Sequence, residues 1–187
     1  MTPLPMLALL LGQVVVSPAT DPPQIVLAFA EDPHRPLLAA RLQRQLPGSQ
    51  LYIQGDRSLL DLSVRRLKAA RLWSAPPPHL LELRGPCDTV GQLVAFLPVL
   101  DRFPSPGRLT VVTSRGHLGR AVAIARTLTV LRGWHVDGSA VDAGFVTPQH
   151  PLSTPRDVVR ALLWRVTGWH GRLGACSQAP MDPRRFR

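Results

Sequence analysis

The segment TSRGHLGRA, residues 113–121, carries side chains that could bind and act on an anion. His117 and Arg120 are three residues apart, so on a helix they would share one face. An arginine binds phosphate or carboxylate through a fixed fork of donors, and an imidazole can donate a hydrogen bond or carry a proton. Thr113 and Ser114 directly precede the pair and add two hydroxyl groups. The other interpretation is that His117 and Arg120 are surface residues of an arginine-rich helix.

Asp88 and Thr89 form a second candidate group. Either side chain can cap a helix, and the free N–H groups at a helix N-terminus attract anions. Acid–base chemistry would combine His117 with Asp32, Asp56 or Asp88. We take His117 and Asp88 as the catalytic candidates, and plain helix capping is the alternative role for Asp88 and Thr89.

Alternating strands and helices would have to position these residues. The apolar runs predict strands at 24–30, 50–56, 79–85 and 108–114, with a last strand at 134–141 or 143–146. Apolar residues at helical spacing predict helices at 36–46, 58–73, 88–103, 116–132 and 154–169, the third of them disturbed or ended near Pro98. This rhythm is typical of βαβ units, and it predicts a Rossmann-like three-layer α/β/α fold around a mostly parallel sheet of about five strands.

Ligands of such sheets bind beyond the carboxyl ends of the strands. The loops that follow the first four strands are therefore the expected walls of a pocket. These loops contain residues 31–32, 55–56, 87–89 and 113–117. On this reasoning Asp56 joins the candidate ligand-binding residues.

The length of 187 residues and a hydrophobic content of 45% indicate one globular domain. We place this domain at residues 24–170, after an apolar, proline-rich segment at 1–23 and before a flexible basic tail at 171–187. The net charge of +10 raises the alternative of nucleic-acid binding. The basic residues are scattered and aromatic residues make up only 5%, so a small anionic ligand is favoured over nucleic acid.

The apolar run within residues 1–19 is too short to span a bilayer, which needs about 20 residues. It has the length of a signal-peptide core, but no Lys or Arg precedes it, and it could also pack on the domain. We expect a cytoplasmic protein, or a membrane-associated or exported one if this segment acts as a signal. Membrane association is expected only through this segment.

Cys87 and Cys176 lack metal-like spacing, and incidental or structural thiols are favoured over a disulfide. No metal site is indicated, and the cofactor, if there is one, is not specified by any motif.

The segment VVTSRGHLGRA resembles the VTSxxHxxRA signature of the YdcF-like family, the SanA/ElyC/YdcF domain of unknown function in bacteria. DTVGQ, residues 88–92, resembles a second family motif, and the likeness covers residues 24–170, with cyanobacterial members as the most similar group. The matching positions are Thr89, Thr113, Ser114, His117 and Arg120, with Arg35 at a motif arginine and Gln92 where the family has Asn.

The resemblance implies a Rossmann-like fold whose pocket takes a small anionic ligand, phosphorylated or nucleotide-like, and some members are linked to cell-envelope processes. This chain departs from the family in two loops: AEDPHR follows the first strand and QGD the second, where members have glycine-rich sequences. Glycines let a backbone approach a phosphate closely. A diverged, non-catalytic binding or regulatory protein of the same fold is therefore the alternative to an enzyme.

Overall fold

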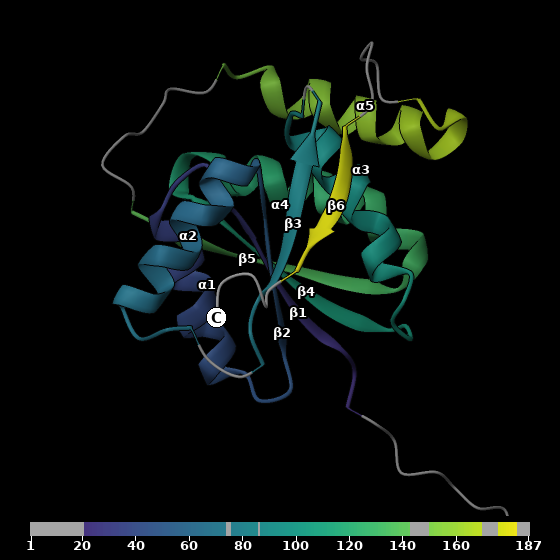
Figure 1. Cartoon of the computed structure of the whole chain (residues 1–187). Helices are drawn as coiled ribbons and strands as arrows, with labels where there is room; N and C mark the ends of the chain where they lie inside the picture. Colours follow the sequence, from purple (N-terminus) through teal and green to yellow (C-terminus); the bar gives the residue numbers. More distant parts are fainter. Residues whose placement is uncertain (1–20, 74–75, 86, 143–149, 170–175, 183–187) are drawn as a thin grey trace, which may run out of the picture.

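The computed structural model describes residues 21–73, 76–85, 87–142, 150–169 and 176–182. Its sheet consists of β1 (Gln24–Phe29), β2 (Gln50–Gly55), β3 (His79–Arg84), β4 (Gly107–Ser114), β5 (Trp134–Val141) and β6 (Ser177–Met181). Its helices are α1 (His34–Gln45), α2 (Arg57–Ala69), α3 (Thr89–Leu100), α4 (Arg115–Thr129) and α5 (Ser153–Thr167), with a 3-10 turn at Val130–Arg132. The strand order is β5-β4-β1-β2-β3-β6, and only β6 is antiparallel (Figure 1). The predicted Rossmann-like α/β/α fold is confirmed.

Two apolar layers enclose the sheet. Alternate residues of β1 point to opposite faces, so Ile25 and Leu27 enter one core while Val26 and Ala28 enter the other. Helices α1 and α2 cover the second core, and α3, α4 and α5 cover the first. This double cover explains why β1 reads as an unbroken apolar run: neither of its faces meets water.

All five helices begin and end within a few residues of their predicted bounds, and α2, predicted to reach Trp73, ends at Ala69. Helix α3 continues through Pro98 to Leu100, whereas the sequence predicted a disturbance there. Pro98 is exposed while Leu97 and Val99 on either side are buried, so packing holds the helix together although one backbone N–H is missing. The helix predicted to end at Arg132 instead ends at Thr129 and continues as the 3-10 turn.

The last described strand corrects two predictions. Residues 177–181, expected in a flexible tail, form β6 and pair with β3. Cys87 and Cys176, expected as incidental thiols, form a disulfide across 89 positions of sequence. The segment SQAPM has no apolar alternation that would have predicted a strand, and Pro180 is tolerated because β6 is an edge strand.

Some predictions fall outside the described residues. The alternative last strand at 143–146 lies there, and β5 occupies the other predicted position at 134–141. The N-terminal run at 1–19 and the chain beyond residue 182 lie there too. Among the residues that the structure describes, no helix is long and apolar enough to cross a membrane.

The disulfide should contribute strongly to stability because it closes a loop of 89 positions. We expect Cys87→Ser with Cys176→Ser to lower the free energy of unfolding by about 2–4 kcal/mol. Chemical denaturation of both proteins measures this difference. Dithiothreitol should reproduce the loss in the native protein and leave the double variant unchanged. Equal stability of the two oxidised proteins would contradict the expectation.

Candidate functional site

A cavity of about 250 Å³ opens at the carboxyl ends of the strands. The strand order reverses between β1 and β4, so α1 leaves toward one face of the sheet and α4 toward the other. Such a reversal leaves a crevice where α/β proteins bind ligands. The cavity is lined by Phe29, Glu31, Arg35, Cys87, Asp88, Thr89, Gln92, Thr113, His117, Arg120 and Ala121.

Arg35, on the first turn of α1, links the two sides of this crevice. Its guanidinium donates to the hydroxyl of Ser114 at 3.0 Å and lies 3.2 Å from the carboxylate of Glu31. The residue is only 9% exposed, and its Nε has no hydrogen-bond partner among the described residues. Burial lowers the pKa of Arg35, while Glu31 and Asp32 oppose this effect. The cavity wall therefore includes a buried cation.

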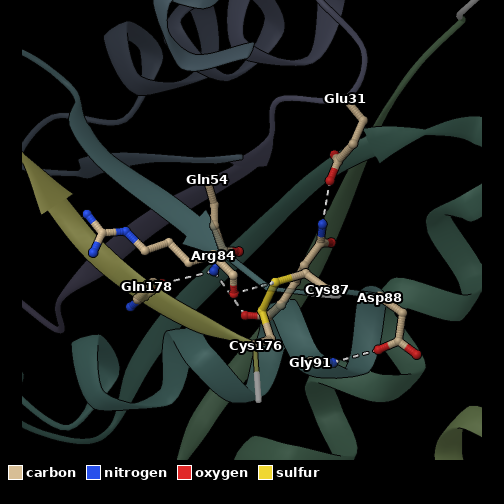
Figure 2. Close-up of a disulfide and its surroundings, with 9 residues drawn as sticks. Glu31, Gln54, Arg84, Cys87, Asp88, Gly91, Cys176 and Gln178 are labelled. Atoms are coloured by element: carbon tan, nitrogen blue, oxygen red, sulfur yellow. Dashed lines mark hydrogen bonds between the residues drawn. A yellow bond between two sulfur atoms is a disulfide. The ribbon is translucent and has the colours of Figure 1, made fainter. Parts of the chain in front are cut away.

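Glu31 connects this cation to α3 and to the C-terminal strand. The amide of Gln92 donates to the Glu31 carboxylate, and the side-chain amide of Gln54 donates to the backbone carbonyl of Gln92 at 3.0 Å. The same Gln54 nitrogen donates to the side chain of Gln178 on β6 at 2.9 Å. Figure 2 shows these residues around the Cys87–Cys176 disulfide. The cavity wall is therefore tied to β6 by one covalent bond and one hydrogen-bond chain.

Arg120 is held by contacts from two other helices. Its guanidinium donates to the Thr89 hydroxyl at 2.8 Å, and its Nε lies 3.5 Å from Asp157 on α5, an ion-pair contact without a hydrogen bond. Asp157 is 2% exposed and also accepts from Arg160 at 3.1 Å. Arg160 in turn donates to Asp88 at 2.6 Å. Two arginines and two carboxylates thus alternate from α4 through α5 to α3.

His117 lines the cavity from the first turn of α4 and is half-buried. Desolvation by burial lowers its pKa, and the positive charges of Arg120 and Arg35 lower it further. At neutral pH the imidazole is therefore neutral, and it can accept a proton or donate one N–H. This protonation state suits a general base or a neutral hydrogen-bond donor to an anion.

The structure brings most of the candidate residues together. Thr89, Gln92, Thr113, His117, Arg120 and Arg35 line one cavity, and Ser114 lies behind it through its bond to Arg35. Asp56 is not among the lining residues: it caps α2 by accepting from the N–H of Leu59. Asp32 likewise accepts from the N–H of His34 and is not among them.

Asp88 lines the cavity, but its carboxylate already has structural contacts. One oxygen caps α3 by accepting from the N–H of Gly91 at 2.9 Å, and the other accepts from Arg160. Both oxygens are engaged, so a proton-transfer role would require breaking these contacts. The capping function proposed from sequence is confirmed, and the catalytic role stays a prediction.

Sequence reasoning missed Glu31 and Asp157 as parts of the site. Asp157 and Arg160 have i, i+3 spacing on an amphipathic helix, and Asp157 is the one acidic residue of that helix, which is a usable signal for an ion pair. Nothing in that spacing identifies Arg120 and Asp88 as the partners, because those contacts cross between helices that lie far apart in sequence. The sequence analysis placed Glu31 in a loop expected to line the pocket, but it assigned no function to its side chain.

A larger cavity, about 410 Å³, lies between α3 and the edge formed by β3 and β6. Its walls include the stacked rings of Tyr52 and His79, whose centroids are 4.6 Å apart, and one arginine, Arg102. Size alone would favour this cavity, but the converging guanidinium, imidazole and hydroxyl groups lie in the smaller one. We therefore take the smaller cavity as the candidate site.

Within the described residues, no cluster of His, Cys, Asp and Glu could hold a metal ion. Comparison with protein-family models, curated proteins and solved structures finds no match to this chain.

The effect of the Arg120 charge on the pKa of His117 should be measurable. We expect proton NMR to give His117 a pKa below its usual 6.5, and Arg120→Gln to move it upward because one of the charges opposing protonation is removed. Arg41→Gln, the same change on the exposed face of α1, should leave the His117 titration unchanged. A native pKa at or above 6.5 would contradict this account. Because folding lowers this pKa, protonation of His117 should reduce stability as the pH falls below 6.5.

Asp157 should be essential for stability because it is buried between cations. Replacement by Asn removes the charge that compensates Arg120 and Arg160, and we expect a loss of about 3–5 kcal/mol in the free energy of unfolding. Asp137→Asn, at an ion pair whose two side chains are more than half exposed, serves as the control and should cost less than about 1 kcal/mol. Similar losses in the two variants would contradict a buried network.

Proposed function

We propose that the chain is a YdcF-like protein that binds a small anionic ligand, phosphorylated or nucleotide-like, in the smaller cavity. The supporting observation is the convergence of Arg35, Arg120 and His117 where the strand order reverses. These side chains come from α1 and α4, and Thr89 adds a hydroxyl from α3. Arg35, Thr89, His117 and Arg120 are also positions that match the family motifs, and that match was made from the sequence alone.

The donors fit an anion of modest size. The side chains of Arg35 and Arg120 belong to the cavity wall, and Thr113 adds a hydroxyl to it. The N-termini of α3 and α4 add N–H groups and partial positive charge. A volume of about 250 Å³ holds a phosphate with a compact organic group, so a bulky nucleotide would extend into solvent.

Glu31 would compete with the ligand for Arg35. Its carboxylate is 40% exposed, so it can turn toward solvent when an anion takes its place. Ligand binding in the native protein therefore includes the cost of breaking one partly exposed ion pair and the hydrogen bond from Gln92 to Glu31. An amide at this position would remove the competing charge.

A second candidate is a diverged member that binds a ligand without catalysing a reaction. Asp88 is engaged by Gly91 and Arg160, which leaves His117 as the remaining candidate for proton transfer. The loops at 30–35 and 54–56, which lack the glycine-rich sequences of the family, also favour a non-catalytic member. Nucleic-acid binding rests on the net charge of +10 alone and is the weakest candidate.

We infer that the protein matures in an oxidising compartment. Disulfides persist outside the reducing cytosol, so the Cys87–Cys176 bond supports export over the cytoplasmic alternative. An envelope-related activity, as the resemblance suggests, is consistent with this location. Mass spectrometry of thiol-blocked cell fractions would locate the oxidised chain.

A thermal-shift series with inorganic phosphate, pyrophosphate, ADP and a sugar phosphate tests the cavity. A ligand present at 100 times its Kd should stabilise the native protein by about 2.7 kcal/mol. His117→Ala with Arg120→Ala should abolish the shift, and Glu31→Gln should increase it at subsaturating ligand. Arg41→Ala, an exposed arginine of α1, is the matched control and should retain the shift.

Two outcomes would overturn the proposal. A ligand shift that persists unchanged in the folded double variant would place binding elsewhere. The absence of any shift with all four anions in the native protein would remove the support for an anion site.

A further inference from the structure

The outer face of α5 is apolar. Among the described residues, seven large hydrophobic side chains are exposed, and five of them lie on or beside this helix. They are Leu152 (65% exposed), Val159 (62%), Leu162 (46%), Val166 (85%) and Trp169 (54%). Their spacing of seven, three, four and three residues places them along one side of a helix. We call these five residues the α5 stripe.

The opposite face of α5 is already used for packing. Ala161 and Trp164 join the core beneath α3 and α4, and Asp157 and Arg160 bind the charged groups beside the cavity. Figure 1 shows α5 along one edge of the molecule, outside the sheet. The α5 stripe therefore cannot be explained by the core of this domain. A row of exposed apolar side chains along one helix face is the pattern of a helix that contacts a partner or a membrane.

A second copy of the chain is a poor partner for the α5 stripe. A 15-residue helix is about 22 Å long and about 10 Å wide, so its outer face covers roughly 220 Å². A stable interface buries about 800 Å² on each partner. Two copies would also each carry a net charge of +10, which opposes their approach.

An anionic bilayer matches both the apolar character and the charge. Arg156 lies on α5 beside the stripe; its Nε donates to Asp157 at 3.0 Å, but the side chain is 64% exposed. The whole chain is strongly basic. Helices that lie on membranes have an apolar face flanked by basic residues, often with Trp at the interface. Trp169 stands at the C-terminal end of α5, and its ring combines a large apolar body with one polar N–H.

We propose that the α5 stripe docks on an anionic membrane surface, with the axis of α5 parallel to the bilayer. The apolar side chains enter the boundary between headgroups and acyl chains, while the net positive charge of the chain attracts the lipid phosphates. This contact is separate from the anion cavity, which no residue of α5 lines. Asp157 and Arg160, which contact the cavity-lining Arg120 and Asp88, belong to the face of α5 opposite the stripe. The membrane contact adds a second attachment to any made by the apolar run within residues 1–19.

Vesicle co-sedimentation of the full chain tests the proposal. We expect binding to vesicles of phosphatidylcholine with 30% phosphatidylglycerol, weaker binding at high salt, and no binding to phosphatidylcholine alone. Leu162→Glu with Val166→Glu should reduce the bound fraction at least fivefold. The control, Ser58→Glu with Ala69→Glu, makes the same charge change at exposed positions of α2 on the other face of the sheet and should bind within twofold of the native chain.

Three further results of these experiments would support or overturn the proposed membrane contact of α5. Loss of binding in Leu10→Glu, with full binding retained in the α5 variant, would assign the membrane contact to the N-terminal run and overturn the proposal. Dimerisation that the α5 substitutions abolish, without vesicle binding, would overturn it in favour of a second copy. Unchanged vesicle binding by His117→Ala with Arg120→Ala would show that docking is independent of the anion cavity, as proposed.

Discussion

The hydrogen bond from Arg35 to Ser114 joins helix α1 to the end of strand β4, at the point where the strand order of the sheet reverses. Arg35 belongs to the helix that covers one face, and Ser114 ends the strand that leads to the helix on the other. Without a side chain spanning this point, the reversal of strand order would leave an open crevice. The bond keeps a cation inside that crevice, and Glu31 and the neighbouring dipoles make its burial tolerable.

Charge balance is the second organising constraint of the site. Each cation near the cavity has a carboxylate within ion-pair distance: Arg35 has Glu31, and Arg120 has Asp157. Such pairing compensates guanidinium groups that would be costly to bury alone. The pairs differ in exposure, so the one containing Glu31 can rearrange and the one containing Asp157 cannot.

The fold was predictable because its main signals are local. The apolar run of β1 and the helix starts at Asp88 and Ser114 can be read within a few residues, and the parallel topology then brings Thr89 close to Arg120. The remaining features depend on distant partners. Nothing near Cys176 indicates Cys87, and β6 has no pattern of its own because its pairing with β3 supplies the stability that its sequence lacks. Asp56 was assigned to the site from its position after a strand, but the cap of α2 uses its carboxylate.

The disulfide also makes the cavity depend on the order of synthesis. Cys87 lines the cavity, yet its partner is Cys176, which emerges from the ribosome after every other described helix and strand except β6. A chain interrupted before that point contains all five parallel strands but lacks the covalent brace behind the α3 wall. Only a chain that has been synthesised past Cys176 can have a fully braced cavity.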